Sequence, residues 1–330
     1  MASPANTIAF FGLGVMGYPM ALNLRTKMEN DKTLLICDVS EDAINRFKKD
    51  TEGRGVVESV GNGFEAAQAA DVVLSMLPDG PVVEKVYLDE STGVLAGVAA
   101  AAKQSPVRKL IVECGTIQSD SIDKVAKATK DLAQTLDNDS VLDFADAPVS
   151  GGPMGAQDGT LAFMVGSDKP DTVFPEVKAV LSHMGKADSI FLCGAVGAGT
   201  AFKVINNYLS AITSLAASEA LNIGVKLGLD PRKLTDVINA SGGQCWVTSK
   251  SSPVPGVQAN VPSSRNYEGG FRIELCKKVL GMGTELAKRA GARTVLDGPT
   301  MAAFEEVAAD ERYKGKDARV VYKWLNESPR

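Results

Sequence analysis

The stretch TIAFFGLGVMGYPMALNL, residues 7–24, decides the fold of the first part of the chain. Residues 8–11 form a short apolar run that is typical of a buried strand. The glycine pattern Gly12-x-Gly14-x-x-Gly17 follows at once, and the apolar residues beyond it recur at helical spacing. The stretch therefore predicts a strand, a glycine-rich turn and a helix, in that order.

Each glycine of this pattern has a physical role in a turn that binds a dinucleotide. The first allows the tight turn, the second lets backbone N–H groups approach a pyrophosphate, and the third lets the helix pack against the strand. The diphosphate then lies at the positive end of the helix. Any strand–helix turn could carry three glycines, but the flanking strand and helix favour the dinucleotide interpretation. The expected cofactor contacts are Gly12, Leu13, Gly14, Val15, Met16 and Gly17.

A second apolar run, residues 34–37, ends in Asp38, about twenty residues after the glycine turn, where an acidic residue can accept both ribose hydroxyls of an adenosine. A 2′-phosphate beside Asp38 would meet a like-charge repulsion of about 4 kcal/mol at 4 Å and intermediate dielectric. Even a third of that is about tenfold in affinity, so NAD is expected rather than NADP. Asp38 could instead only cap the next turn.

Further buried strands are expected at residues 72–77, 110–112, 141–145 and 162–165, alternating with helical patterns. This alternation predicts an α/β domain with a parallel, doubly wound sheet of the Rossmann type. The stretch PVSGGPMGAQDG, residues 148–159, is a second glycine-rich loop. Its backbone amides could converge on an anion, and a merely flexible loop is equally compatible with the sequence.

The composition of the sequence changes near residue 198. Residues 198–227 form an alanine-rich helical run that is apolar on most faces, and such a helix is expected to be buried. The remaining sequence is helical, interrupted by a loop at residues 249–270. We therefore expect a dinucleotide-binding domain at residues 1–195 and an all-helical domain at residues 196–330, built on the long linker helix.

Composition narrows the class of protein. The 330 residues contain 35 Lys and Arg against 40 Asp and Glu, so no basic surface for nucleic acid is indicated. The five cysteines are scattered without a C-x-x-C pair, which favours reduced thiols over disulfides or a metal site. Only six residues precede the first strand, and the apolar run at residues 97–102 is too short to span a bilayer. The expected location is the cytoplasm, with a mitochondrial one left open.

The linker helix carries polar groups that need partners. Lys203, Asn206 and Asn207 are three and four residues apart and so share one helix face. His183, the single histidine, lies in a segment typical of an ordinary helix end, so a proton acceptor must come from another residue type. A lysine partly desolvated beside a nicotinamide would have a pKa lowered toward the working range. Lys203 could alternatively have a structural role, extending to solvent at the helix start.

Five ordered stretches together resemble the β-hydroxyacid dehydrogenase family. They are GLGVMGYPMALNL from Gly12, MLP from Met76, GTI from Gly115, DAPVSGGPMGAQDGTL from Asp146 and GAGTAFKVINNYL from Gly197. The stretch from Cys245 to Phe271 is most similar to the 3-hydroxyisobutyrate branch of that family.

The resemblance implies a Rossmann domain followed by a helical domain that pairs into dimers or tetramers. It implies that Lys203 is the acid/base and that Asn207 orients the substrate. The residues implied to bind substrate are Ser150, Gly151, Gly152, Asn207, Trp246 and Phe271. Further implied cofactor contacts are Leu77, Pro78, Val82, Thr116 and Lys278.

Two departures from the family pattern lie near the expected substrate pocket. Val279 stands where the family usually has aspartate, and Ser251 stands where the 3-hydroxyisobutyrate branch has tyrosine. The expected reaction is NAD-dependent oxidation of a small 3-hydroxy acid such as 3-hydroxyisobutyrate. A serine-like or bulkier acid, reduction of a carbonyl or imine, and a non-catalytic NAD-binding scaffold are the alternatives. A phosphosugar acid is disfavoured because no arginine cluster accompanies these motifs.

Overall fold

The computed structural model describes residues 6–137 and 139–327, so the ends of the two predicted domains lie outside the described residues. Its contacts divide the chain into two compact units, Met1–Lys203 and Val204–Arg330. The division falls inside a long helix, whereas the sequence predicts a domain boundary just before that helix, at residue 195.

The first unit is built on one sheet. Its strands are β1 (Thr7–Phe11), β2 (Thr33–Cys37), β3 (Val56–Ser59), β4 (Val72–Ser75), β5 (Arg108–Glu113), β6 (Val141–Asp146), β7 (Val149–Ser150), β8 (Leu161–Gly166) and β9 (Gly185–Gly194). They follow the order β3-β2-β1-β4-β5-β6-β8-β7, with β9 beside β8. Ile8 of β1 lies between Leu34 of β2 and Val72 of β4, and all pairs from β3 to β6 are parallel. The doubly wound Rossmann sheet predicted from the sequence is confirmed.

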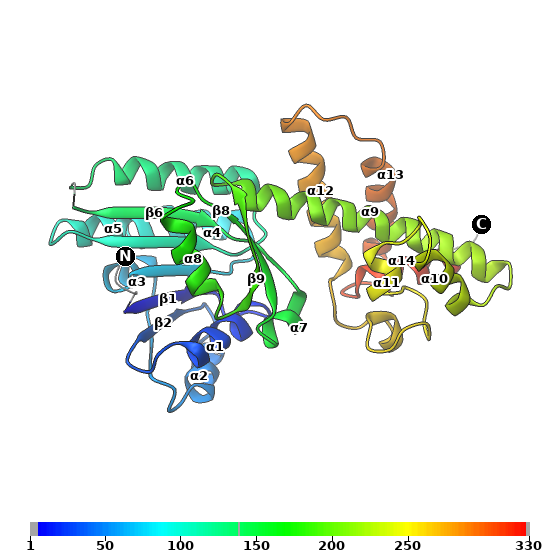
Figure 1. Cartoon of the computed structure of the whole chain (residues 1–330), viewed down its shortest axis with the longest axis horizontal. Coiled ribbons are helices and arrows are strands. Elements are labelled where there is room, and N and C mark those ends of the chain that lie inside the picture. The colour runs from blue at the N-terminus through cyan, green and yellow to red at the C-terminus, as the bar shows by residue number, and fades with distance from the viewer. Residues whose placement is uncertain (1–5, 138, 328–330) are drawn as a thin grey trace. The chain divides into compact units, whose positions relative to one another are not determined.

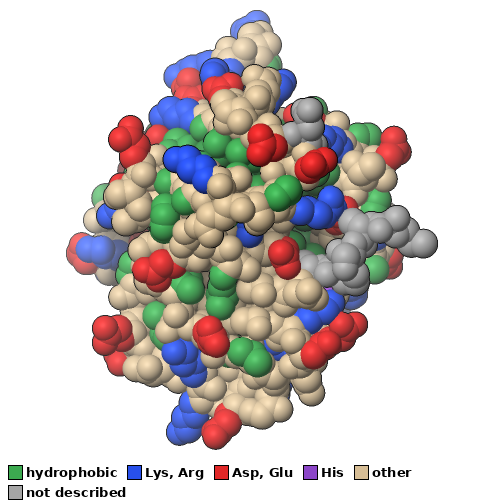
Figure 2. Space-filling model, turned by 90° about the vertical axis from the view of Figure 1, so that its left-hand side faces the viewer, with side chains coloured by type: hydrophobic (Ala, Val, Ile, Leu, Met, Phe, Trp, Pro, Cys, Tyr) green, Lys and Arg blue, Asp and Glu red, His purple; other side chains and the backbone are tan. Residues whose placement is uncertain are grey.

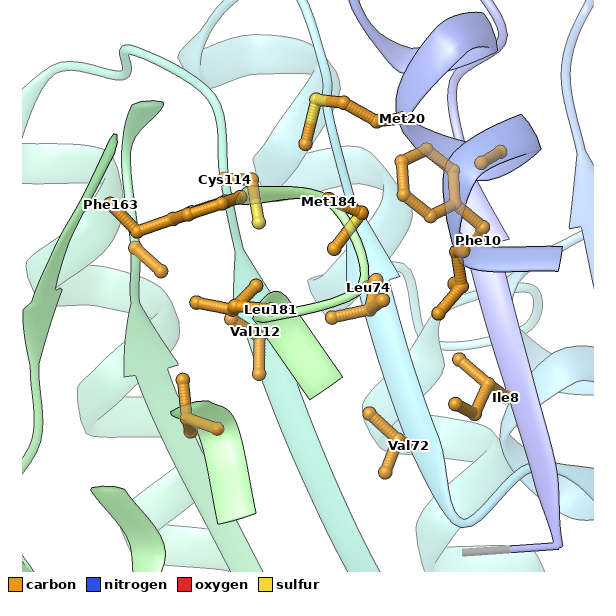
Figure 3. Packing of buried hydrophobic residues seen from close by; sticks show 14 of the residues in the cluster. Ile8, Phe10, Met20, Val72, Leu74, Val112, Cys114, Phe163, Leu181 and Met184 are labelled. Atoms are coloured by element: carbon orange, nitrogen blue, oxygen red, sulfur yellow. The ribbon is translucent and has the colours of Figure 1, made fainter. Parts of the chain in front are cut away.

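Helices cover both faces of this sheet (Figure 1). They are α1 (Gly17–Lys27), α2 (Glu41–Asp50), α3 (Gly63–Ala69), α4 (Gly80–Leu88), α5 (Val94–Ala102), α6 (Ser119–Ala133), α7 (Gly152–Gln157) and α8 (Val173–Leu181). Alternate residues of β1 enter different cores: Ile8 and Phe10 pack with α1 and α8, whereas Ala9 and Phe11 pack with α3 to α6. Figure 3 shows the first core, in which Phe10 lies beside Met20. Burial on both faces explains the continuous apolar strands.

The far edge of the sheet departs from the purely parallel arrangement predicted by the strand–helix alternation. β8 pairs antiparallel with β6 and with β7, and β9 then pairs parallel with β8. The reason is the segment between β6 and β8, in which the chain reverses through β7 and the short helix α7 instead of crossing over the sheet. The second glycine-rich loop is therefore the turn of an antiparallel return.

The second unit is helical. After the linker helix α9 (Ala198–Lys226) come α10 (Pro231–Asn239), α11 (Trp246–Lys250), η1 (Pro262–Arg265), α12 (Ile273–Arg289), α13 (Asp297–Ala309), η2 (Ala318–Val320) and α14 (Val321–Glu327). Its core gathers Leu280 of α12, Phe304 of α13 and Val321 of α14 around Ala211 of α9. A Cβ on Gly283 would lie 2.6 Å from the Tyr208 ring, so α12 and α9 approach closely.

The prediction that α9 is buried on most faces is wrong for one stripe of the helix. Val204, Ala211 and Leu221 are buried, but Leu209 and Leu227 are 61% and 71% exposed. The apolar character that suggested burial all round therefore covers two faces, one packed within the chain and one open.

One face of the molecule carries both signs of charge. On the face seen in Figure 2, acidic and basic side chains are interspersed and neither forms a continuous patch. No helix in the described residues is both long and apolar enough to cross a membrane. In the same described ranges no group of three potential ligands could hold a metal ion, and all five cysteines are free thiols.

Candidate active site

The glycine turn between β1 and α1 is built by close backbone contacts. Gly12 has φ +92°, and a Cβ there would lie 2.4 Å from the Met76 carbonyl oxygen. A Cβ on Gly17 would lie 1.9 Å from the Gly12 carbonyl oxygen, so only glycine lets α1 start so close to β1. Gly14 is exposed with no atom within 4 Å of a Cβ, and its neighbour Val15 is 73% exposed. The turn thus leaves open space beside its second glycine, where a pyrophosphate is expected to lie.

Asp38 lies beside this turn, at the end of β2. One carboxylate oxygen accepts a hydrogen bond from the Leu13 N–H at 2.5 Å, and the other accepts from the Ser40 N–H at 2.8 Å. The second bond is the local cap that the sequence left open as an alternative. Each carboxylate oxygen keeps lone pairs for ribose hydroxyls, so the two interpretations are compatible. Leu13 is buried and Met16 is half-buried, so the exposed side of the turn is backbone and Val15.

Two loops follow β4 and β5 and lie against one another. A Cβ on Gly115 would be 2.8 Å from the Leu77 carbonyl oxygen, and the Gly80 N–H donates to Gln118 Oε1 at 3.1 Å. The predicted cofactor contacts Leu77, Pro78 and Thr116 therefore stand on neighbouring loops at the carboxyl ends of parallel strands. In open α/β sheets, this is the edge where ligands bind. Val82 is exposed on the first turn of α4, which the Asp79 side chain caps.

A buried polar network that the sequence analysis missed lies beneath these two loops. Glu113, at the end of β5, is completely buried and accepts hydrogen bonds from the Ser75 hydroxyl and, at 2.6 Å, from the Gly115 N–H. The Ser75 hydroxyl also bonds the buried Tyr87 hydroxyl. Burial raises the pKa of Glu113 to about 8. The only sequence signal was an acidic residue at the end of an apolar strand.

The second glycine-rich loop opens α7. Gly151 and Gly152 have φ +138° and +63°, both are exposed, and Ser150 before them is half-buried at the end of β7. The Asn23 side-chain amide of α1 donates to the Ala156 carbonyl at 2.8 Å, which fixes α7 against the helix that follows the glycine turn. The first N–H groups of a helix lack intrahelical acceptors, so this turn can receive a carboxylate.

Lys203 stands on the second turn of α9 and is only 8% exposed. Burial lowers the pKa of its amine to about 8. In the described residues it makes no hydrogen bond or ion pair with another side chain or with the backbone. An amine in this state exchanges a proton near neutral pH, as a general acid/base must.

The remaining predicted residues belong to the second unit. Asn207 is half-buried one turn after Lys203, and its side-chain oxygen accepts from the Asn206 amide at 3.3 Å. Trp246 opens α11 and is 56% exposed, with the Arg319 guanidinium 5.6 Å from its ring centroid.

Phe271 is 37% exposed, and its N–H donates to the buried Asp317 carboxylate at 2.8 Å. Lys278 is half-buried on α12, beside the buried Val279. Ser251, at the other position that departs from the family pattern, is also buried.

Comparison with protein families finds two models that match this chain. The NAD binding domain of 6-phosphogluconate dehydrogenase matches residues 7–197, more than half of the chain. The chain belongs to the β-hydroxyacid dehydrogenase family. The second match, described as NAD-binding of NADP-dependent 3-hydroxyisobutyrate dehydrogenase, covers residues 197–325 of this family member.

Full-length relatives agree with this assignment. A probable mitochondrial 3-hydroxyisobutyrate dehydrogenase of Dictyostelium discoideum is 37% identical over 99% of the chain and 92% of its own length. An NAD-dependent L-serine dehydrogenase of Pseudomonas aeruginosa is 35% identical over 96% of both. The structure of Mycobacterium tuberculosis 3-hydroxyisobutyrate dehydrogenase with L-serine has a TM-score of 0.81 at 33% identity, covering 97% of this chain and 99% of the other. This family member is an NAD-dependent oxidoreductase that acts on a CH–OH group.

Proposed function

We propose that this dehydrogenase oxidises a small 3-hydroxy acid, with 3-hydroxyisobutyrate as the first candidate, and that Lys203 removes the hydroxyl proton. The bound NAD would supply the acceptor for the hydride that leaves the carbon bearing the hydroxyl. Ser150, Gly151 and Gly152 would hold the carboxylate, and Asn207 would orient the substrate. The carboxylate anchor and the amine together would fix which carbon is oxidised.

The observation that carries the proposal is the burial of Lys203, which lowers the pKa of its amine. A lysine in water is almost fully protonated at neutral pH, whereas burial brings the pKa of this amine to about 8. A substantial neutral fraction is then present near the working pH. The neutral amine takes the hydroxyl proton in oxidation, and the protonated amine returns it in reduction.

The residues expected to hold the cofactor fit an NAD molecule. The open Gly14 leaves room for the pyrophosphate, and Asp38 places a carboxylate where adenosine ribose hydroxyls are expected. Leu77, Pro78, Val82, Thr116 and Lys278 would complete the contacts. The Asp38 charge supports a preference for NAD over NADP, because it would repel a 2′-phosphate.

The exposed stripe of α9 supports a homo-oligomer. Ile205, Leu209, Ile223 and Leu227 recur on one face of the helix and are each more than half exposed. Large exposed apolar patches are uncommon on monomers and mark interaction surfaces. We therefore propose a dimer or tetramer in which the helical units pair through this stripe.

Replacement of the proposed acid/base tests the assignment. We expect Lys203→Ala to abolish turnover, to about 0.1% or less, while NAD still binds with wild-type affinity. Lys203→Arg should be equally inactive, because an arginine cannot lose its proton in a protein. The exposed Lys226 on the same helix provides the control, and Lys226→Ala should turn over normally. Turnover by Lys203→Ala above one tenth of wild type would refute the role.

L-Serine is the second candidate substrate, since it is also a 3-hydroxy acid. A 35% identical relative is named an NAD-dependent L-serine dehydrogenase, and the similar mycobacterial structure contains L-serine. Ser251, in place of tyrosine, bears on the choice because it changes the expected size and polarity of the substrate pocket. Comparing kcat/KM for 3-hydroxyisobutyrate, L-serine and a bulkier 3-hydroxy acid, each with NAD and NADP, separates these candidates.

A further inference from the structure

A buried carboxylate holds the start of the helix that carries Lys203. Asp146 is the last residue of β6 and is completely buried. Its Oδ1 accepts a hydrogen bond from the Gly197 N–H at 2.7 Å, and its Oδ2 accepts from the Thr200 N–H at 2.6 Å. Two N–H groups at the beginning of α9 thus donate to the same side chain, which belongs to a strand of the sheet. No step proposed above uses that side chain.

The contact between Asp146 and α9 has no spare room. A Cβ on Gly199 would lie 2.1 Å from the Met164 carbonyl oxygen, and a Cβ on Gly166 would lie 2.2 Å from Asp146 Oδ1. A side chain at either glycine would clash, and the turn cannot move closer to the strands. The start of α9 is therefore set by rigid backbone contacts and by the carboxylate, rather than by side chains that could adjust.

Lys203 depends on this anchor for its place. It follows Thr200 by three residues and so stands on the next turn of the same side of α9. No polar contact with another described residue holds its amine. The position of the amine is consequently fixed by the helix and by the packing around the buried side chain, and the beginning of that helix is held by Asp146.

We propose that Asp146 is a positioning residue for Lys203, which caps α9 and thereby keeps the amine where the substrate hydroxyl must lose its proton. The inference rests on the proposed role of Lys203. Asp146 itself touches no reacting atom, so its effect on the reaction is exerted entirely through the helix.

Asp146→Asn tests the kinetic consequence. An asparagine can accept from only one of the two N–H groups and turns its own N–H₂ toward the other, so the first turn of α9 must shift. We expect kcat to fall by about 10- to 100-fold, as misplacement of a catalytic group by about 1 Å does. The affinity for NAD should stay unchanged, because the glycine turn and Asp38 are not touched.

Asp143→Asn is the matched control. Asp143 lies three residues earlier on the same strand and is paired with Lys169 at 2.7 Å, so the substitution is identical but leaves α9 alone. It should keep wild-type kcat. A shared loss of kcat in both variants would mean that any charge removed from β6 impairs the enzyme, and it would overturn the proposal.

Chemical labelling of the amine gives a readout that needs no turnover. With trace acetic anhydride and mass spectrometry, we expect Lys203 to be acetylated at least about threefold faster in Asp146→Asn than in wild type, because a loosened turn uncovers a buried amine. The rate in Asp143→Asn should match wild type. Equal Lys203 labelling in all three proteins would overturn the proposal.

A second variant covers the case in which Asp146→Asn does not fold. Gly199→Ala keeps the carboxylate but forces the same turn away from the Met164 carbonyl, and it should show the same kinetic and labelling changes. Wild-type behaviour of that variant would contradict the inference. If Lys203→Ala retains turnover, the proposed function fails, while the labelling comparison still decides whether Asp146 positions the amine.

Discussion

Lys203 shows how one buried side chain can set the pH range of a reaction. Because burial lowers the pKa of its amine to about 8, the neutral form that oxidation requires falls about tenfold for each pH unit below that value. We expect kcat/KM for hydroxy-acid oxidation to rise up to about pH 8 and then level off. For the reverse reduction, which requires the protonated amine, kcat/KM should fall above about pH 8.

The measurement is a pair of profiles of kcat/KM against pH, one for each direction, taken at saturating cofactor. Opposite limbs with a shared midpoint are expected, since both report the same amine. Flat profiles between about pH 6 and 9 would show that another group exchanges the proton, or that a step other than chemistry limits the rate.

Asp38 carries the second residue-scale prediction, which concerns cofactor choice. Replacement by asparagine removes the charge that would oppose a 2′-phosphate and keeps an acceptor for one of the two N–H groups that Asp38 binds. Comparing NADP with NAD in the same variant cancels the effect of the lost hydrogen bond on the turn. Asp38→Asn should therefore raise the ratio of kcat/KM for NADP over NAD by about tenfold or more. The exposed Asp42 at the start of α2 provides a matched control, and Asp42→Asn should leave the ratio unchanged. An unchanged ratio in Asp38→Asn would assign Asp38 to capping alone.

At this scale, sequence reasoning found residues whose chemistry is tied to a local pattern. The glycines around Gly14 and the acid at Asp38 belong to a turn whose physics is contained in a short stretch. Asp146 and Glu113 could not be assigned from the sequence, because their partners lie about fifty and about forty residues away along the chain. Only the sheet brings those partners together.

Among the elements, the ends of β4 and β5 are joined through Glu113, and this junction has a pH-dependent stability. An unfolded glutamate ionises near pH 4.5, whereas burial raises the pKa of folded Glu113 to about 8. Between these values the folded state holds a proton that the unfolded state has lost. The contribution of Glu113 to the free energy of unfolding therefore falls as pH rises through this window.

Glu113→Gln tests this linkage, because glutamine does not titrate. The free energy of unfolding of the variant minus that of wild type, measured by urea denaturation, should increase between about pH 5 and 8, because only wild type loses stability over this range. The exposed Glu58 on β3 provides a control, and Glu58→Gln should show a difference that changes little with pH. A constant difference for Glu113→Gln would mean that the carboxyl group is ionised in the folded protein.

Element-scale predictions succeeded where a strand is buried on both faces and failed where direction depends on a connection. The continuous apolar runs of β1, β2 and β5 were sufficient to predict these strands. The direction of β8 could not be deduced, because the sequence does not distinguish a glycine-rich reversal of the chain from a crossover connection. The prediction for the linker helix was wrong for a different reason. Its composition showed that α9 is apolar, but not which apolar face packs within the chain.

For the whole molecule, that uncovered face leads to a prediction about assembly. The exposed stripe runs for about 33 Å at the usual helical rise per residue, from Ile205 to Leu227, the residue that follows α9. A twofold interface uses the same patch on both copies, and one apolar stripe is well suited to pair with itself. We therefore expect the wild-type protein to sediment as a dimer or tetramer at micromolar concentration.

Placing charge in this stripe should separate the copies. In Leu209→Glu combined with Ile223→Glu, each twofold interface would bury four unpaired carboxylates. Burying each of them would destabilise the assembly by several kcal/mol. Sedimentation velocity should then report smaller species, whereas Val56→Glu, on an exposed edge-strand valine of the first unit, should leave the assembly intact. A monomeric wild-type protein, or an unchanged oligomer in the double variant, would show that the copies do not pair through α9. The stripe would then have to be covered by something other than a second copy.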